Sequence, residues 1–378
     1  MARPLAGTLV LSLDQAVAAP LTTRKLADAG ARVIKLERPE GDFARDYDHL
    51  VGGQCTHFVW LNRGKESVVA DLTKAEDRRL FEAIIAKADV LVQNLKPGAL
   101  AKLGFAMEEL RRRHPRLICC SISGYGDEGP YRERKAYDLL IQAESGLASV
   151  TGGPEAPARV GVSVVDICTG MNAYEAILEA LIARGRMGVG ADIRVSMFDS
   201  MMEWMAVPML YTEYGMPPKR IGLSHSSLAP YGVFETADKV PILISIQNDR
   251  EWVVFCAEVL EKPELARDPR FASNPARLAN RAETDAMVAR CFGGAGHRGA
   301  VAPAGRGRDR LCARQRHRGH PAAPALAALA HRLTQRAHRA AGAAGKMGGG
   351  RRPELRAAAG AGGAYAGGAA GVFGGVRV

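Results

Sequence analysis

Short apolar runs rich in β-branched residues alternate with helical stretches over the first third of the chain. The runs occupy residues 8–13, 32–37, 67–70, 90–92 and 117–122, and helical patterning covers the stretch from Pro20 to Ala29 and residues 74–87. Gly30 follows the first helical stretch, where a residue without a side chain commonly ends a helix. Strands that alternate with helices predict an α/β fold with a parallel, doubly wound, Rossmann-like sheet. Ligands of such sheets bind where loops leave the carboxyl ends of the strands.

The length of the chain, 378 residues, is enough for about two domains. We expect a large α/β domain over residues 1–200, a linker helix region over 201–224 and a smaller α+β domain over 225–292. The strand-type run at 242–246 belongs to the smaller domain.

Positive charge is concentrated at the end of the chain. The net charge is +11, but residues 293–378 hold 15 basic and two acidic side chains, so the first 292 residues are close to neutral. This segment is dominated by Ala, Gly and Arg. Three interpretations are open: a basic disordered arm, an Ala-rich helix near 322–344, or an out-of-frame translation of a GC-rich gene, which we favour because Ser, Glu, Gln and Lys are sparse. The charge therefore gives no reason to expect a nucleic-acid partner.

The apolar residues and the cysteines indicate a location in the cell. No run of about 18 uncharged apolar residues occurs, so we expect no membrane-spanning helix. Asp14 interrupts an initial run that faintly resembles a secretory signal, which leaves secretion as a minor alternative. Seven cysteines without regular spacing predict neither a disulfide framework nor a zinc site. We expect the cytoplasm.

One motif has the spacing of a dinucleotide-binding loop, but the residues that follow it argue against that function. Residues 124–129 read GYGDEG, which matches the G-x-G-x-x-G spacing after a strand. In a dinucleotide fold the last Gly opens a helix, whereas here a polar loop, PYRERK, follows. A nicotinamide or flavin enzyme is therefore only a runner-up. The four His residues before residue 293 show no metal-ligand spacing, and we expect no metal.

Asp166 is a single carboxylate at the junction of an apolar stretch and an apolar-faced helix. Two roles are open for it. Asp is a preferred N-cap, because its oxygens accept the free N–H groups of a first helical turn. It is also a candidate covalent nucleophile, since the apolar Val164, Val165 and Ile167 limit its solvation and a helix N-terminus favours negative charge. We expect the helix to end at Arg184-Gly185.

Six ordered segments carry a resemblance to a known family. They are PLAG (4–7), LADAGARVIKLERP (26–39), LNRGKES (61–67), QNLKPG (93–98), SGYG (123–126) and KAYD (135–138). Together they resemble the class III CoA-transferases, the family of formyl-CoA transferase and of the carnitine and bile-acid CoA-transferases. The similarity covers roughly residues 4–292.

The resemblance implies a fold, an assembly and a mechanism. It implies a large α/β domain, a smaller domain and an interlocked homodimer. It places the family's catalytic aspartate on Asp166, which attacks an acyl-CoA thioester and passes CoA to a second carboxylate through covalent aspartyl intermediates. No cofactor is bound permanently, because the coenzyme A thioester is itself a substrate.

The same resemblance suggests which residues contact CoA. Matched position by position, these are Arg38, Lys65, Asn94, Lys102, Lys135 and Tyr137. Taken singly, the cations would more often be solvated surface charges and the tyrosine an amphipathic core residue. Lys35 and Lys96 have no such match and are assigned that ordinary role.

The residues of these motifs also suggest a class of substrate. They are most similar to those of the family branch that uses succinyl-CoA or a similar donor and short dicarboxylic acids such as succinate, mesaconate, itaconate or malate. Formate and oxalate are not expected, because Val17 stands where formyl-CoA transferases have Gln. The acceptor could contact His225, Ser226 or Arg250, whose polarity is equally typical of loops and helix caps.

Two alternatives to CoA transfer stay open. The α-methylacyl-CoA racemases share the fold, but Tyr137-Asp138 stands where they have His-Asp, which disfavours proton exchange. If residues 293–378 are out of frame, the chain is an inactive product.

Overall fold

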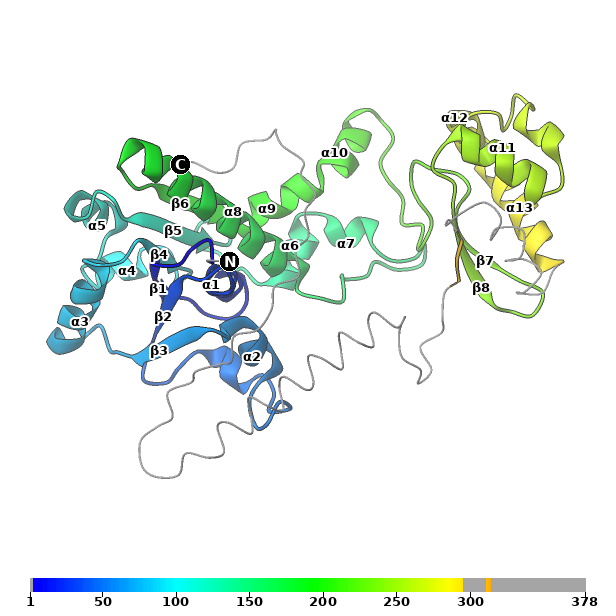
Figure 1. Cartoon of the computed structure of the whole chain (residues 1–378). Coiled ribbons are helices and arrows are strands. Elements are labelled where there is room, and N and C mark those ends of the chain that lie inside the picture. The colour runs from blue at the N-terminus through cyan, green and yellow to red at the C-terminus, as the bar shows by residue number, and fades with distance from the viewer. Residues whose placement is uncertain (1–2, 295–310, 314–378) are drawn as a thin grey trace. The chain divides into compact units, whose positions relative to one another are not determined.

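The computed structural model of the chain describes residues 3–294 and 311–313 (Figure 1). These residues divide into two compact units. The first contains 3–148 and 159–210, and the second contains 149–158, 211–294 and 311–313. The division after Leu210 falls inside the segment 201–224 that was expected as a linker, and a ten-residue segment from the middle of the chain joins the second unit.

The first unit is built on a six-stranded parallel sheet with the order β3-β2-β1-β4-β5-β6. Its strands are β1 (Leu9–Leu13), β2 (Arg32–Glu37), β3 (Lys65–Val69), β4 (Val90–Gln93), β5 (Ile118–Ser123) and β6 (Asp192–Ser196). The chain winds outward from β1 to β3 and then returns to add β4 on the other side of β1, where Leu11 pairs with Ile34 of β2 and Leu91 of β4. The prediction of a parallel, doubly wound sheet is confirmed. The sequence did not suggest β6.

Helices flank the sheet (Figure 1). Successive residues of a strand point to opposite faces, so Val10 packs with helices α1 and α8 and Leu11 packs with α3, α4 and α5. Alternation of this kind requires both faces of each strand to be apolar, which explains the nearly continuous apolar runs in the sequence. The helices and the 3-10 turn of this part of the chain are α1 (Ala18–Asp28), η1 (Phe43–Asp46), α2 (Thr56–Asn62), α3 (Ala75–Ile85), α4 (Ala99–Lys102), α5 (Met107–Arg113), α6 (Asp138–Glu144), α7 (Leu147–Val150), α8 (Val164–Met187), α9 (Met197–Trp204) and α10 (Ala206–Glu213).

Helix α8 is the longest of these and crosses α1 at very short range. A Cβ atom on Gly170 would lie 2.6 Å from the carbonyl oxygen of Ala18 and 3.1 Å from Leu21 Cβ. The Thr22 hydroxyl donates to the Gly170 carbonyl oxygen at 3.1 Å. The end of α8 differs from expectation: the helix continues through Gly185 to Met187 and stops at Gly188, whose φ of 79° is left-handed.

The second unit has a small antiparallel sheet and its own core. Strand β8 (Pro241–Ser245) pairs with β7 (Tyr231–Glu235) on one side and with β9 (Leu311–Ala313) on the other. The core gathers aromatic side chains around Trp252. Its helices and 3-10 turn are α11 (Asp249–Glu258), η2 (Pro263–Ala266), α12 (Asn274–Ala279) and α13 (Arg281–Gly293). Strand β9 belongs to the Ala/Gly/Arg-rich segment, of which 295–310 and 314–378 lie outside the described residues.

None of the described helices combines the length and the apolar character that crossing a membrane requires.

The short α1–α8 crossing generates a stability prediction. Gly170→Ala places a methyl group against backbone, and we expect it to lower the free energy of unfolding by about 1–3 kcal/mol. Gly185→Ala is the matched control in the same helix, because its Cβ would meet nothing within 4 Å. Removing that glycine should leave stability unchanged or raise it by about 0.5–1 kcal/mol. Denaturant titration followed by circular dichroism measures both, and equal stability of the two variants would contradict the packing argument.

Candidate active site

Asp166 is the third residue of α8, in its first turn. The helix begins after Ser163, whose side chain makes no capping hydrogen bond. The half-buried carboxylate of Asp166 accepts the backbone N–H of Ala18, the first residue of α1. Helix α1 has no side-chain cap of its own and no acidic residue in its first turn. Asp166 therefore caps a helix, but it caps α1 and not the helix to which it belongs.

The electrostatics of Asp166 differ from those of an exposed aspartate. The pKa of Asp166 is raised to about 7, mainly by burial; the negative charge of Asp138 contributes to this rise, and the hydrogen bond from Ala18 opposes it. At neutral pH the free protein therefore holds comparable amounts of the protonated and ionised forms. The ionised form is poorly solvated, which is the state in which a carboxylate is a stronger nucleophile.

The cap of α8 comes from Asp138, the first residue of α6. Its Oδ1 accepts the N–H of Val165 at 2.8 Å and the N–H of Asp166 at 3.4 Å. The sequence analysis noted Asp138 only as the neighbour of Tyr137. Its role was not predictable from spacing, because 27 residues separate it from Val165.

The loops that follow β1 and β4 meet where the strand order reverses, which is the usual ligand-binding position in this type of sheet. Asn94, predicted to contact CoA, lies in the loop after β4. Its side chain accepts the N–H of Gln15 at 2.9 Å and donates to the Gln15 carbonyl oxygen at 2.9 Å. Asn94 is thus at the expected edge of the sheet, where its amide ties the two loops together.

Lys65 departs from the prediction that it contacts CoA. Its side chain is almost completely buried, and Nζ lies 3.0 Å from Asp14 Oδ2, 3.1 Å from the Pro20 carbonyl oxygen and 2.9 Å from Asn62 Oδ1. An ammonium group has three N–H donors, so these contacts leave none for a phosphate. Burial is the main reason that the pKa of Lys65 is lowered to about 8. A sequence match could not reveal this, because the partners come from distant segments.

Lys35 was assigned an ordinary surface role, and that assignment is wrong. Its Nζ is buried and lies 2.6 Å from Asp14 Oδ1 and 2.9 Å from Asp42 Oδ2. Burial would lower the pKa of Lys35, but the charges of Asp14 and Asp42 outweigh it and raise the pKa. Lys35, Lys65, Asp14 and Asp42 form a buried ion cluster at the carboxyl ends of β1 and β2.

The other predicted CoA contacts lie on the surface. Arg38, Lys102 and Lys135 are exposed, and none has an ion pair with another residue of 3–294 or 311–313. Tyr137 is 60% exposed. Lys96, which lacked a family match, is paired with Glu133 at 3.3 Å. Of these four cations, Arg38, Lys102 and Lys135 are exposed and without an ion pair among the described residues, whereas Lys96 already pairs with Glu133.

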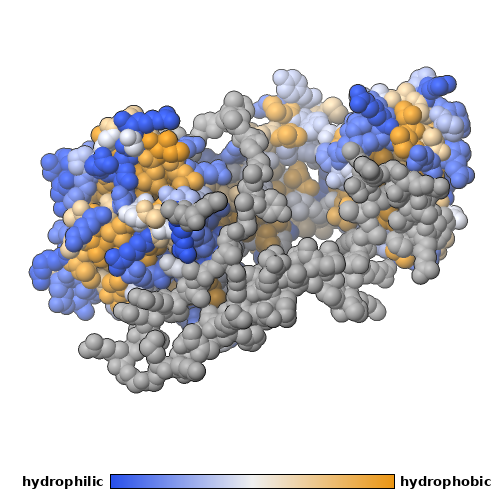
Figure 2. Space-filling view, in the orientation of Figure 1, coloured by the Kyte–Doolittle hydropathy of each residue, from blue (hydrophilic) through white to orange (hydrophobic). Residues whose placement is uncertain are grey.

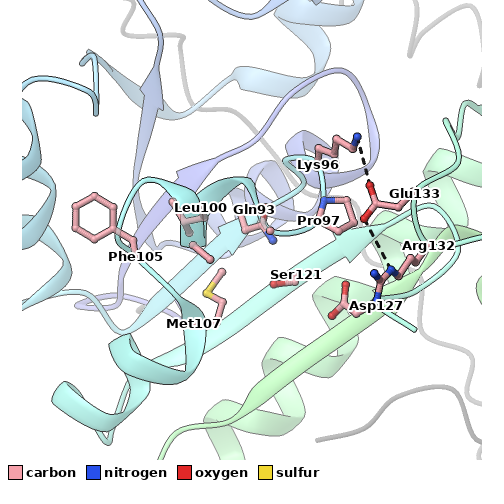
Figure 3. Close-up of a pocket in the computed structure, with 12 residues that line it drawn as sticks. Gln93, Lys96, Pro97, Leu100, Phe105, Met107, Ser121, Asp127, Arg132 and Glu133 are labelled. Carbon is pink, nitrogen blue, oxygen red and sulfur yellow. Dashed lines mark ion pairs between the residues drawn. The ribbon is translucent and has the colours of Figure 1, made fainter. Parts of the chain in front are cut away.

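A pocket of about 310 Å³ opens beside the carboxyl ends of β4 and β5 (Figure 3). Gln93 and Ser121 come from these strands, and Leu100, Phe105 and Met107 supply apolar lining. Lys96 and Arg132 both approach Glu133 at one side of the pocket (Figure 3). Gln93 and Lys96 belong to the QNLKPG segment and Arg132 and Glu133 to the PYRERK loop, but neither segment was predicted to line a pocket.

Aromatic side chains also gather near Asp166. Phe43, Tyr47, His57 and Trp60 form a row with ring centroids 5.9–6.3 Å apart. Burial raises the pKa of Tyr47, and the charges of Asp42 and Asp166 and the nearby Tyr137 raise it further. Tyr47 therefore lies within electrostatic range of both Asp166 and Tyr137.

Next to this row, the donor atoms of Asp48, Cys55 and His57 lie within 4.8 Å of one another. Sequence spacing did not suggest this group. The Asp48 carboxylate accepts the N–H of Thr56 at 3.0 Å, which caps the start of α2. Capping accounts for the position of this carboxylate.

The fold and these motifs agree with one protein family. Residues 5–308 match the model of CoA-transferase family III, and the chain belongs to that family. The match extends 16 residues beyond position 292, where the resemblance was expected to stop.

Three proteins illustrate the relationship. The acetyl-CoA:oxalate CoA-transferase of Acetobacter aceti is 44% identical over 281 residues, which cover 73% of this chain and 72% of that protein. The succinyl-CoA:mesaconate CoA-transferase of Haloarcula hispanica is 37% identical over 72% of this chain and 70% of its own length. The crystal structure of Rv3272 from M. tuberculosis superposes with a TM-score of 0.76 at 31% identity and covers 87% of both chains. The predicted family is confirmed.

The raised pKa of Asp166 generates a prediction for stability. The pKa of this carboxyl group in the folded protein is above its unfolded value of 3.8. The folded protein therefore loses stability as pH rises from about 4 to about 7, because ionising the group costs more free energy in the folded state. Asp166→Asn removes this cost and keeps an oxygen for the Ala18 N–H. We expect the Tm of Asp166→Asn to exceed that of the wild type by a difference that grows from pH 4 to pH 7 and is constant above pH 7. About 1 kcal/mol corresponds to roughly 2–4 °C in a unit of this size.

Scanning fluorimetry across pH measures this difference. A Tm difference that does not change with pH would show that Asp166 titrates normally.

Proposed function

We propose that this chain transfers CoA from an acyl-CoA, succinyl-CoA or a similar thioester, to a short dicarboxylic acid, and that Asp166 is the covalent nucleophile. The observation that carries the proposal is the poorly solvated carboxylate at the junction of two helix N-termini. Two such termini favour the negative charge that burial disfavours, so the group can ionise and still be reactive.

The proposed reaction proceeds through exchanges at one carboxyl group. An Asp166 oxygen attacks the thioester carbonyl of the donor, the C–S bond breaks, and an acyl-aspartyl anhydride and CoA thiolate form. The thiolate attacks the aspartyl carbonyl, releases the donor acid and leaves an aspartyl-CoA thioester. The acceptor carboxylate then displaces the thiolate, which attacks the acceptor half of the new anhydride and frees Asp166 as the new acyl-CoA forms. The overall reaction exchanges one thioester for another, so its net free-energy change is small and the protein has to lower the barriers, including those to and from the anhydrides.

Arg38, Lys102 and Lys135 are the cations that we assign to the phosphates of CoA. They are exposed and belong to the loops and short helix that follow the carboxyl ends of β2, β4 and β5. We assign Tyr137 to the pantetheine end, since it lies beside Asp138 and within electrostatic range of Tyr47. Lys65 is better assigned to the buried ion cluster, and Asn94 to tying the loops.

The acceptor is proposed from the relatives. They are named for oxalate and mesaconate, both short dicarboxylates, which supports a dicarboxylic acceptor. Oxalate, which Val17 seemed to disfavour, returns as a candidate because the oxalate enzyme is 44% identical. Val17 is 5% exposed and packs with Leu21 and Leu61, so its replacement of Gln is compatible with a role in packing.

We also propose a cytoplasmic homodimer. Helix α10 buries none of its residues, and Val207 and Leu210 are more than half exposed. Figure 2 shows apolar surface over this helix. Contiguous exposed apolar surface of this kind is typical of a protein interface. The described cysteines are free thiols, as expected in a reducing compartment.

The covalent step is testable with a donor alone. Incubation with succinyl-CoA, without an acceptor, should leave a CoA adduct on the proteolytic peptide that contains Asp166, detected by mass spectrometry. Asp166→Ala should lack the adduct and lose transfer to all members of a panel containing oxalate, mesaconate, succinate, itaconate and malate. Transfer by Asp166→Ala at the wild-type rate would exclude the nucleophile assignment.

The assignment of phosphate-binding cations predicts a selective effect on affinity. Lys102→Ala and Lys135→Ala should each raise the KM for acyl-CoA roughly five- to tenfold and leave kcat nearly unchanged, because a charged hydrogen bond contributes about 1.5–3 kcal/mol and solvent recovers part of it. Lys96→Ala is the matched control, since that ammonium is paired with Glu133. An equal rise in KM for all three variants would indicate a general charge effect.

A further inference from the structure

The carboxylate of Asp138 connects α6 to the first turn of α8. Oδ1 accepts the N–H groups of Val165 and Asp166 at 2.8 and 3.4 Å, and Oδ2 accepts Gln142 Nε2 at 2.6 Å. Asp138 therefore uses both oxygens, one toward the helix that carries Asp166 and one toward its own helix. No other side chain caps the start of α8 among the described residues.

Gln142 extends this connection to the loop before α8. Its side chain is completely buried, and its Oε1 accepts the N–H of Val160 at 2.8 Å. A backbone N–H requires an acceptor and an ionised carboxylate requires a donor, so the two partners fix the orientation of the Gln142 amide. The result is a continuous hydrogen-bonded path from Val160 through Gln142 and Asp138 to the backbone of Asp166.

Among residues 3–294 and 311–313, no cation acts on Asp166 to offset the charge of Asp138. From α1, Asp166 receives only the backbone N–H of Ala18. Tyr47 directly follows η1, Asp138 is the first residue of α6, and Cys168 lies on α8 itself. Of these groups, Asp138 is the one that carries a negative charge at neutral pH and acts on Asp166.

We propose that Asp138 is a positioning residue for Asp166: its carboxylate fixes the first turn of α8, and its negative charge opposes the ionisation of Asp166. The catalytic part of this inference rests on the proposed function. The structural part rests on the hydrogen bonds and stands without it.

The charge of Asp138 has a consequence for the attack on a thioester. When an Asp166 oxygen bonds to the acyl carbon, the carboxylate becomes a neutral anhydride and its negative charge leaves with the CoA sulfur. The repulsion between the two aspartates is present before this step and absent after it. Asp138 thus raises the free energy of the ionised reactant relative to the covalent intermediate, at the cost of a smaller ionised fraction at low pH.

The first test is the pH dependence of kcat/KM for acyl-CoA. The wild-type acid limb should have its midpoint near 7, and Asp138→Asn should move it roughly 0.5–1 unit lower, because a neighbouring negative charge is removed. Asp77→Asn is the matched control: Asp77 lies in the first turn of α3 and accepts the N–H of Asp71 at 2.7 Å, but it does not act on Asp166. Its acid limb should stay at the wild-type pH.

A second variant separates charge from geometry. Asp138→Asn alone places two amide NH₂ groups against each other, which can weaken the fold. The double variant Asp138→Asn/Gln142→Glu reverses donor and acceptor between the two side chains, so each hydrogen bond is kept while the charge moves to position 142. We expect this variant to recover the wild-type Tm and to keep an acid limb below that of the wild type. Recovery of Tm together with the wild-type acid limb would overturn the charge role.

A third measurement does not depend on activity. The gain in Tm from Asp166→Asn should be smaller in the Asp138→Asn background than in the wild type at pH 8, and the two gains should be equal at pH 5, where Asp166 is protonated. Coupling at pH 8 in a protein that transfers no CoA would support the Asp138 inference and reject the proposed function. Equal gains at both pH values, with an unmoved acid limb, would overturn the inference.

Discussion

The close crossing of α1 and α8 is the contact on which the site depends. Because Gly170 has no side chain, the backbones of the two helices approach each other, and their amino-terminal ends lie side by side. Asp166 on α8 is then within hydrogen-bonding reach of Ala18 on α1. A larger residue at position 170 would separate the helices and remove that N–H from the carboxylate, although position 170 is one helical turn away from Asp166.

The arrangement of carboxylates that caps the two helices is also the one on which the proposed reactivity of Asp166 depends. Asp138 caps α8 and Asp166 caps α1, so each carboxylate satisfies N–H groups of a helix other than its own. Cross-helix caps of this kind hold the carboxylates at fixed positions in partly dry surroundings. A carboxylate that capped its own helix from a solvated position would have neither constraint.

The elements of the fold could be predicted from the sequence because they depend on local patterning. Residues 32–37 were expected as a strand and form β2 with the same bounds, since an apolar run between a glycine and a proline has few alternatives. The strand β6 was missed, because Asp192 and Arg194 alternate with apolar residues and give a weak signal over five residues. The end of α8 was placed three residues early, because Gly185 is tolerated inside a helix and Gly188 adopts the left-handed conformation that ends it.

The residues of the site were predictable only where a side chain acts alone. Asp166 was singled out by its position before an apolar helix and is proposed as the nucleophile, and the exposed Arg38, Lys102 and Lys135 lie in loops and a short helix after the strands. Lys35 was misjudged as a surface residue, and the buried contacts of Lys65 were not foreseen, because burial and ion pairing with Asp14 depend on contacts between distant segments. Asp138 and Gln142 were missed for the same reason: hydrogen bonds that cross 18 to 28 residues leave no periodic trace.

The bond pair between Asn94 and Gln15 has a consequence for ligand entry. The Asn94 amide accepts from and donates to the backbone of Gln15, as two paired strand residues do. These two hydrogen bonds lie just beyond the last residues of β1 and β4. The two halves of the doubly wound sheet are therefore joined at the point where they would otherwise diverge. The conformational entropy of these loops is lost when the protein folds and not when a ligand arrives, so this edge of the sheet is preorganised and adaptation to different ligands falls to the surrounding side chains.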